Sequence, residues 1–387
     1  MKHIDEYRDG TLARGIAARI ARDAVPGRHY QFMEFCGGHT HAISRYGLED
    51  LLPGNVQMVH GPGCPVCVLP AGRIDDAIKL AMCPGNTMCT YADLMRVPAS
   101  GGTTLLRASA AGADIRMVYS TLDALRIAEA EPHRQIVFLA IGFETTTPPT
   151  ALAISAARRK NLRNFSVFCN HVLTPPAMRA ILAAPAQPGG ARIRVDGFIG
   201  PAHVSSVTGT RPYLELAEEF SKPVVVAGFE PLDVMHAILM LVHQVNESRH
   251  NVENQYTRLV TTDGNRIAQR EMAKVFALRE TFEWRGLGEV PFSALRLSSD
   301  YADLDAEHRF GITTVRAADN PACECATILR GLKKPADCKL FGTVCSPETP
   351  MGSCMVSAEG ACAAHWTFGR FRDRAAVGRP ARVKIPA

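Results

Sequence analysis

The sequence has no apolar run long enough to cross a membrane and no recognisable export signal. A membrane-spanning helix needs about 18 or more consecutive apolar residues, and no uncharged run in the 387 residues approaches that length. The first ten residues, MKHIDEYRDG, are polar, whereas a signal peptide carries an apolar segment and a cleavage site. We therefore expect a cytoplasmic protein with no membrane partner.

The chain also has little excess of either charge. Its formal net charge is +5, from 43 Lys and Arg against 38 Asp and Glu. A nucleic-acid surface normally shows a clustered basic stripe with interleaved aromatic residues, so this balance predicts no nucleic-acid partner. The C-terminal tail is the exception, and we expect it to be a solvated end or a docking segment for a partner protein. Its basic residues are Arg370, Arg372, Arg374, Arg379, Arg382 and Lys384.

Apolar residues make up 47% of the chain, which is too large a share for a disordered protein. The length fits two or three domains with substantial cores and excludes a disulfide-stapled miniprotein. Short β-branched or aromatic runs alternate with helical patterns, which is typical of parallel sheets covered by helices on both faces. Strands are expected at 29–35, 56–60, 87–91, 115–119, 135–141, 165–170, 197–199 and 223–227. Helices are expected at 74–82, 122–130, 150–160, 176–183, 213–220, 231–256 and 265–282.

Eight strands can make one sheet or two, and a short internal likeness favours two. Residues 137–144 and 224–230 are both apolar strands that end in Gly-Phe-Glu, and each is followed by a proline and a helix. We expect an α/β protein with two doubly wound parallel-sheet domains, at residues 1–125 and 126–250. Residues 251–387 are predicted to form a mainly helical third region.

Cysteine is plentiful and unevenly placed. Of the 12 cysteines, six fall in the 40 residues from Cys323 to Cys362, where the average density predicts one or two. In a reducing cytosol, dense cysteines more often indicate metal binding or redox chemistry than structural disulfides. The C-terminal region is therefore expected to carry metal or sulfur chemistry.

The first motif, CGGHTH, directly follows a predicted strand. It places Cys36 before two glycines, with His39 and His41 close behind. Glycines permit a close backbone approach, and imidazoles can lower the pKa of a thiol. We expect Cys36 to be an exposed thiolate in a glycine turn. The alternative is a buried cysteine beside ordinary surface histidines.

The second motif, GPGCPVC, contains a Cys-x-x-Cys pair, Cys64 and Cys67. This spacing closes readily as a disulfide, and it also suits two ligands of one soft metal. A redox dithiol is the favoured interpretation, half of a zinc site is the second, and structural coincidence is the third.

The third motif, GFETTTP, lies between a strand and a helix and offers Glu144, Thr145 and Thr146 to the ligand edge of a sheet. It lacks the lysine of a Walker A loop and the spacing of a dinucleotide fingerprint. Helix capping alone is the competing interpretation. His203 also follows a predicted strand.

The most specific pattern is the C-terminal cysteine series. Four thiolates on loops rich in glycine and proline can surround an iron–sulfur cubane, whereas a four-cysteine zinc site usually uses paired knuckles. We favour the cubane, with Cys325 and Cys354 as a second dithiol beside it. The expected ligands are Cys323, Cys338, Cys345 and Cys362.

Together, these four motifs resemble those of the hydrogenase maturation factor HypD family, in the same order and from about residue 30 to 366. The resemblance implies a scaffold that assembles the Fe(CN)2CO group of NiFe hydrogenases. It implies a HypC-type chaperone as partner, HypE charged by HypF as the cyanide donor, and the hydrogenase large subunit as an indirect partner. It also implies two α/β domains and a domain carrying a 4Fe-4S cluster around a central cleft.

The resemblance also assigns roles to single residues. Cys36 resembles the cysteine that holds iron, with His39 and His41 beside it, and Cys64 and Cys67 resemble the redox pair. The C-terminal series matches the cluster ligands, and Cys325 and Cys354 match a dithiol relay. A shift from Cys323 to Cys325 as ligand would still permit a cubane.

The resulting hypothesis is that electrons pass from the cluster through Cys325 and Cys354 to Cys64 and Cys67, and that thiols near Cys36 hold or reduce the iron. Soft thiolates suit low-spin iron. Two alternatives remain at this point. One is a free-standing iron–sulfur dithiol oxidoreductase, and the other is a zinc-stapled α/β protein that binds a metabolite.

Overall fold

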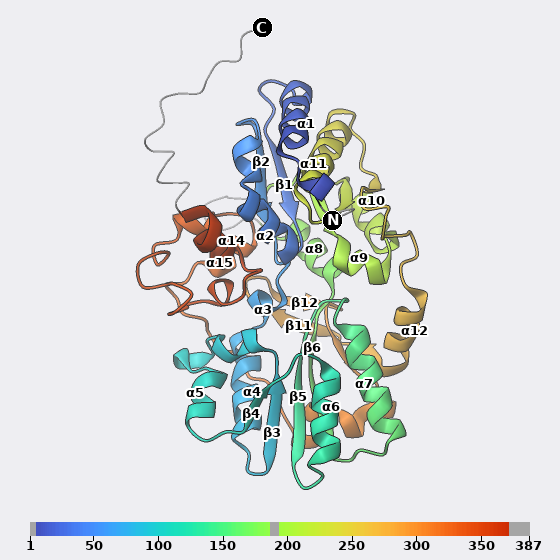
Figure 1. Ribbon diagram of the computed structural model, residues 1–387, viewed down its shortest axis with the longest axis vertical. Helices are drawn as coiled ribbons and strands as arrows, with labels where there is room; N and C mark the ends of the chain where they lie inside the picture. The colour runs from blue at the N-terminus through green and yellow to red at the C-terminus, as the bar shows by residue number, and fades with distance from the viewer. Residues whose placement is uncertain (1–4, 186–192, 371–387) are drawn as a thin grey trace.

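The computed structural model describes residues 5–185 and 193–370, which build two separate parallel sheets (Figure 1). Beyond Arg370, the basic tail lies outside the described residues. The five-stranded sheet has the order β2 (Val56–His60), β1 (Tyr30–Glu34), β7 (Gly197–Pro201), β8 (Val224–Ala227) and β9 (Val252–Asn254). The four-stranded sheet has the order β4 (Ile115–Met117), β3 (Asn86–Thr90), β5 (Gln135–Gly142) and β6 (Phe165–His171).

All eight predicted strands are present, and the expectation of parallel sheets is confirmed. The pairing of the strands is not sequential, however. Strand β1 pairs with β2 on one side and with the late strand β7 on the other, whereas β3 to β6 form their own sheet. The expected boundary after residue 125 therefore falls inside one sheet, between β4 and β5. Strand–helix alternation shows that strands exist but does not encode which of them become neighbours.

Helices cover both faces of each sheet. On the five-stranded sheet, α1 (Gly10–Asp23) and α11 (Pro231–Asn246) pack on one face, and α9 (Ala202–Thr208) and α10 (Leu214–Phe220) pack on the other. On the four-stranded sheet, α6 (Thr121–Ala130) and α7 (Thr147–Arg159) lie opposite α4 (Ala71–Met82) and α5 (Leu105–Ala110). The two remaining long helices of this part are α2 (Gly37–Tyr46) and α8 (Thr174–Ala183).

A single apolar core joins the two sheets. Strand side chains alternate between faces, so Val137, Leu139 and Ile141 of β5 enter the shared core, and Phe138 packs under the outer helices. Inner residues of the five-stranded sheet, such as Phe198, belong to the same core, as do several C-terminal cysteines. Both sheets and the cysteine region are therefore packed as one body.

The region beyond residue 250 is not mainly helical, so that prediction is wrong. The helix expected at 265–282 ends at Val275 and continues as a strand, and the one expected at 231–256 ends at Asn246. Strands of three or four residues are too short to give a visible alternation. Two antiparallel ribbons form, β10 (Phe276–Leu278) with β13 (Leu295–Leu297) and β11 (Thr281–Trp284) with β12 (Gly288–Pro291). The helices here are α12 (Arg266–Val275), η6 (Ser299–Leu304), α13 (Ala306–Phe310), α14 (Cys325–Leu329), η7 (Pro335–Asp337), η8 (Ser353–Met355), α15 (Ala361–Ala364) and η9 (His365–Gly369).

None of the helices in the described ranges is both long and apolar enough to cross a membrane.

Candidate functional site

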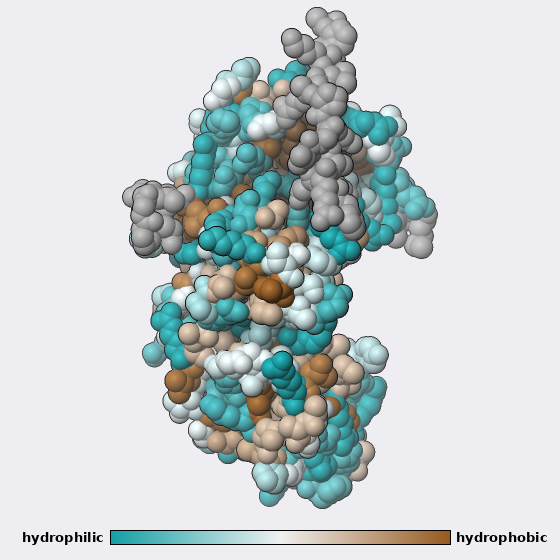
Figure 2. All heavy atoms as spheres, turned by 90° about the vertical axis from the view of Figure 1, so that its left-hand side faces the viewer, coloured by the Kyte–Doolittle hydropathy of each residue, from teal (hydrophilic) through white to brown (hydrophobic). Residues whose placement is uncertain are grey.

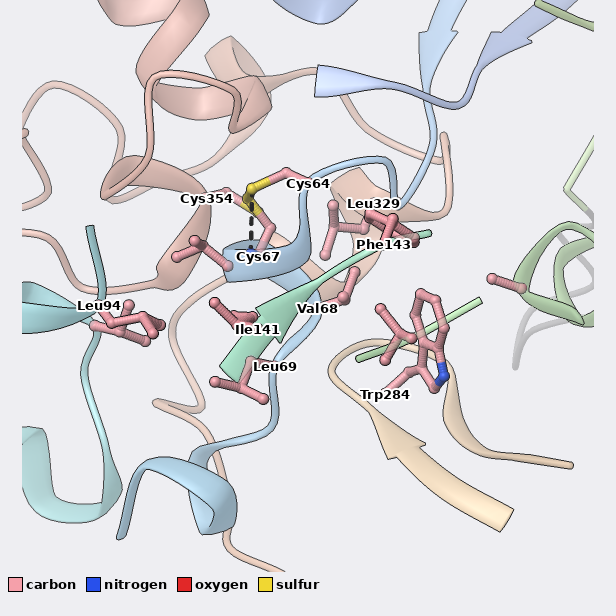
Figure 3. Close-up of a cluster of buried hydrophobic side chains, with 14 of the residues drawn as sticks. Cys64, Cys67, Val68, Leu69, Leu94, Ile141, Phe143, Trp284, Leu329 and Cys354 are labelled. Atoms are coloured by element: carbon pink, nitrogen blue, oxygen red, sulfur yellow. Dashed lines mark hydrogen bonds between the residues drawn. A yellow bond between two sulfur atoms is a disulfide. The ribbon is translucent and has the colours of Figure 1, made fainter. Parts of the chain in front are cut away.

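The GPGCPVC motif lies at the centre of the molecule, where the two sheets meet. Cys64 begins the short helix α3 (Pro65–Val68) and accepts a hydrogen bond from the Cys67 amide at 3.2 Å, and the two cysteines form a disulfide. Both are buried. Figure 3 shows the disulfide above the end of β5, with Ile141 beneath α3, Phe143 to the right of α3 and Cys354 beside the disulfide.

Hydrogen bonds from the C-terminal region fix the position of α3. The Ser353 hydroxyl of η8 donates to the Cys67 carbonyl at 2.9 Å, and the Arg285 amide donates to the Val68 carbonyl at 2.7 Å. The Arg285 guanidinium also donates to the Leu69 carbonyl at 2.9 Å. The GPGCPVC motif is thus held by residues more than 200 positions away in sequence.

The CGGHTH motif lies against the GPGCPVC motif through a close backbone approach. The Gly37 amide donates to the Gly63 carbonyl at 3.1 Å. A Cβ atom on Gly63 would lie 2.4 Å from the Cys36 nitrogen, so only glycine fits there. The structure therefore brings Cys36 and the Cys64–Cys67 pair onto adjacent turns.

Glu34 organises this junction, and the sequence analysis assigned it no role. It is fully buried, and its carboxylate accepts hydrogen bonds from the Cys36 amide at 2.9 Å, from His60 Nδ1 at 2.9 Å and from the Thr40 hydroxyl. Burial alone would lower the pKa of His60, but the hydrogen bond and charge of Glu34 raise it. Both residues end adjacent paired strands, which is the signal that points to them.

Cys36 is buried rather than exposed, so the expectation of an exposed thiolate is wrong. It is 7% exposed, and burial raises the pKa of its thiol, with further contributions from the charges of Glu359 and Glu34. Glu359 belongs to the C-terminal region, and its side chain packs against Gly37. No local sequence pattern indicates this contact. The backbone amides of Gly38 and His39, at the start of α2, oppose the shift and lower the pKa of the thiol.

The two histidines of the motif point to different places because residues two apart lie on opposite sides of a helix. His39 is buried, and its Nε2 donates to the carbonyls of Ala227 and Gly228 at 3.0 Å. Burial lowers the pKa of His39. Its Nδ1 is buried with no hydrogen-bond partner in the described part of the chain. His41 instead packs edge-on against Phe368, with ring centroids 5.0 Å apart.

His203 joins the His39 side of the site through an aromatic stack. The Phe229 ring lies between the two histidines, 4.0 Å from the His203 centroid and 4.9 Å from that of His39. Burial, and then the neighbouring His39, lower the pKa of His203. The structure thus gathers Cys36, His39 and His203 around one surface-reaching stack.

The polar residues of GFETTTP make structural contacts in the fold. Glu144 is buried and accepts bonds from the Thr174 amide at 2.9 Å and hydroxyl at 3.0 Å, which caps α8. Burial raises the pKa of Glu144 to about 7. The Thr146 hydroxyl donates to the Ile141 and Phe143 carbonyls. Glu144 therefore caps α8, whereas the Thr146 hydroxyl bonds carbonyls at the end of β5 and just after it, and Thr145 is partly exposed.

The C-terminal cysteines surround one small apolar cavity. Its walls include Ile328, Leu340, Phe341 and Met355, and its thiols are those of Cys323, Cys325, Cys338, Cys345 and Cys362. All four expected cluster ligands therefore face the same space, and Cys325 joins them. Five thiols in an apolar enclosure fit the donor set of an iron–sulfur cluster.

Within residues 5–185 and 193–370, no three His, Cys, Asp or Glu side chains are arranged to hold one metal ion. A cubane has a different requirement, because each of its irons takes a single cysteine sulfur.

Cys325 and Cys354 connect this cavity with α3. The neighbouring thiols of Cys323 and Cys354 raise the pKa of the Cys325 thiol well above its ordinary value, and that of Cys362 opposes the rise. Cys354 belongs to η8, which packs against α3, and Figure 3 shows it next to the disulfide. Thiols thus extend from the cysteine-lined cavity to the Cys64–Cys67 pair.

Comparison with known proteins points to one family over nearly the whole chain. The family model named HypD, described as the hydrogenase formation hypA family, matches residues 11–369. The chain is 71% identical to a hydrogenase maturation factor HypD of Rhizobium leguminosarum bv. viciae, over 97% of both chains. It is 63% identical to that of Cupriavidus necator and 44% identical to that of Escherichia coli, over at least 95% of this chain and 98% of each relative.

Replacing Gly63 by alanine is expected to separate the two N-terminal motifs. The new Cβ meets the Cys36 backbone, and overpacking of this kind costs roughly 1–3 kcal/mol. Urea unfolding measures this loss of stability. The matched control is Gly15→Ala in α1, which has open space around it and should gain about 0.4–1 kcal/mol. Equal effects of the two substitutions would contradict the close approach.

Replacing Glu34 by glutamine is expected to reverse the pH dependence that His60 gives to stability. The pKa of His60 is raised in the folded protein, so its contribution is complete below the unfolded pKa of about 6.5. It is lost as pH rises through the folded pKa. Without the Glu34 charge, burial dominates and the pKa of His60 falls, so the variant gains stability as pH rises.

Urea unfolding at several pH values and NMR titration of His60 measure this change. Glu280→Gln, which alters an exposed carboxylate, is the control and should keep the original slope. A His60 pKa that stays above 6.5 in Glu34→Gln would refute the assignment.

Proposed function

Because the chain belongs to the HypD family of hydrogenase maturation factors, we propose that it is the scaffold on which the Fe(CN)2CO group of NiFe hydrogenases is assembled. The observation that carries the proposal is that Cys36 and the Cys64–Cys67 pair meet at the contact between Gly63 and Cys36, with Cys354 of the C-terminal region beside the disulfide. These elements belong to distant parts of the sequence. A scaffold for iron needs such soft donors in one enclosed place.

Iron carrying cyanide and carbon monoxide is the cargo, and Cys36 is its proposed ligand. The buried thiol carries a raised pKa, so it is neutral until a cation compensates its charge. Bound iron supplies that cation and makes the thiolate the favoured form. The backbone amides of Gly38 and His39 at the start of α2 lower the pKa of the thiol and so favour the same form.

The thiol pairs provide the redox chemistry of the proposal. Opening the Cys64–Cys67 disulfide takes two electrons and two protons. Thiol–disulfide exchange with Cys325 and Cys354 supplies both, because that pair becomes a disulfide as the first becomes a dithiol. A 4Fe-4S cluster held by Cys323, Cys338, Cys345 and Cys362 would supply electrons for restoring the relay pair.

The proposed partners follow from family membership. A HypC-type chaperone would share the iron at Cys36, and HypE, charged by HypF, would deliver cyanide equivalents. The hydrogenase large subunit would receive the finished group through the chaperone. The exposed ring of His203, stacked on Phe229 beside His39, is the accessible part of the site and the side from which we expect these partners to approach.

Cys36→Ala should abolish loading with iron and cyanide while leaving the visible spectrum of the C-terminal cluster unchanged, because the two sites use different thiols. The measurement is infrared spectroscopy of the chain isolated with its chaperone. Cys83→Ala removes an exposed cysteine at the end of α4 and should keep the cyanide and carbonyl bands. Persistence of those bands in Cys36→Ala would remove Cys36 from its proposed role.

Anaerobic purification should give about four iron and four sulfide per chain, with a brown colour that dithionite bleaches. Replacing Cys338 or Cys345 by alanine should lower both contents, and comparing Cys323→Ala with Cys325→Ala identifies the ligand. A colourless chain with about one zinc, even after reconstitution, would support the zinc-stapled alternative instead. Turnover of a disulfide substrate without any partner would support the free-standing oxidoreductase.

A further inference from the structure

A second cavity, larger than the cysteine-lined one, opens beside it. Its volume is about 690 Å³, within the range of small-molecule sites. One wall is formed by the segment from Arg96 to Arg107, and the other by residues 318–326 and 348–352. The cavity lies on the side of the molecule where Figure 1 shows helices α5 and α14. Figure 2 shows that side face-on, with apolar side chains at mid-height.

Two cysteines belong to the walls of both cavities. Cys323 is partly exposed and Cys325 is 6% exposed, and both line the large cavity and the small one. Gly352 forms part of the large cavity's wall, and a Cβ there would lie 2.3 Å from the Cys323 sulfur and 2.8 Å from that of Cys325. The absence of a side chain lets this wall touch both sulfurs. The inner end of the large cavity is therefore a pair of thiols.

The large cavity has a cationic group available for a ligand. Of the three arginines that line it, Arg285 is paired with Asp319 at 3.3 Å, and Arg96 donates to the Pro347 carbonyl at 2.7 Å. Arg107 is exposed, and within the described ranges its guanidinium bonds only the Gly102 carbonyl, at 2.9 Å. The hydroxyls of Thr104 and Thr349 add hydrogen-bonding groups to the lining.

From this arrangement we propose that the cavity binds a low-molecular-weight anionic thiol, one that carries carboxylates, and that this thiol exchanges with Cys325. The inference rests on the proposed function in that it takes Cys325 and Cys354 as a redox pair. The exchanging thiols lie at the inner end of a concave site, below the protein surface. A small molecule reaches such a position without the protruding loop that a protein partner would need.

The exchange takes place in two steps that conserve atoms and electrons. The ligand's thiolate attacks the Cys325 sulfur of a Cys325–Cys354 disulfide, a ligand–Cys325 bond forms, and Cys354 leaves as a thiolate that takes up a proton. A second ligand molecule attacks the ligand's sulfur in that mixed disulfide and releases Cys325 as a thiol. Two ligand thiols are oxidised to one disulfide, and one protein disulfide is reduced.

The mixed disulfide between Cys325 and the ligand can be trapped by adding the ligand in its oxidised, disulfide form. The full chain carrying Cys354→Ser is purified without oxygen and treated with glutathione disulfide, the anionic probe, or with 2-hydroxyethyl disulfide, the neutral probe. Cys325 breaks the probe's disulfide, keeps one half and releases the other as a thiol. Peptide mass spectrometry should locate the adduct at Cys325.

Charge reversal at Arg107 provides the specific readout. Arg107→Glu should slow adduct formation with the anionic probe about threefold to tenfold at low salt, because an exposed attraction becomes a repulsion. The rate with the neutral probe should not change. Arg14→Glu reverses an exposed charge on α1 and should alter neither rate.

The outcomes separate clearly. No adduct at Cys325, or an anionic-probe rate that does not respond to Arg107→Glu, would overturn the proposal, and so would equal slowing of both probes. If Cys354→Ser does not fold, the unaltered chain serves, because the same probe then closes a Cys325–Cys354 disulfide whose rate should carry the same Arg107 dependence. The assay needs neither a partner nor iron–cyanide cargo, so its failure is distinct from failure of the infrared test of Cys36.

Discussion

The close approach of Gly63 to the backbone of Cys36 is the constraint on which the rest of the site depends. It exists because β1 and β2 are parallel neighbours with Glu34 opposite His60, so both chains leave the sheet at the same edge. That edge is where open α/β sheets place their ligands. A side chain at residue 63 would push the turns apart. Glu34 could then no longer accept hydrogen bonds from both the Cys36 amide and His60.

The electrostatics of this junction are consistent with the proposal that a buried thiol, Cys36, is the iron ligand. Glu34 is fully buried, and Glu359 contributes a second acidic group that raises the pKa of Cys36. Three acidic groups close together are costly unless a cation joins them. His60 offsets part of that charge through its bond to Glu34. Iron at Cys36 would supply the rest, which couples cargo binding to ionisation of the thiol.

Local sequence patterns predicted the parts of this site, and long-range contacts decided how the parts were used. The strands were predictable because their apolar runs are continuous, as in residues 137–141. Cys36 was misjudged as exposed because Glu359, more than 300 residues away, covers Gly37. The interleaved sheets escaped prediction for the same reason, since periodicity carries no information about partners. The capping role of Glu144 depends on Thr174, which only the fold brings near.

The shared core gives the thiols a fixed spacing, and this favours exchange without large domain movements. Cys64, Cys67, Cys325, Cys354 and Cys362 all belong to the core that joins the two sheets. The bonds from Ser353 and Arg285 to the α3 carbonyls hold the disulfide against the C-terminal region. Thiol exchange requires sulfurs in direct contact, and tightly packed interiors shift little. The proposed relay would therefore need a rotation of the Cys354 side chain, between Cys325 and the Cys64–Cys67 disulfide, rather than a movement of domains.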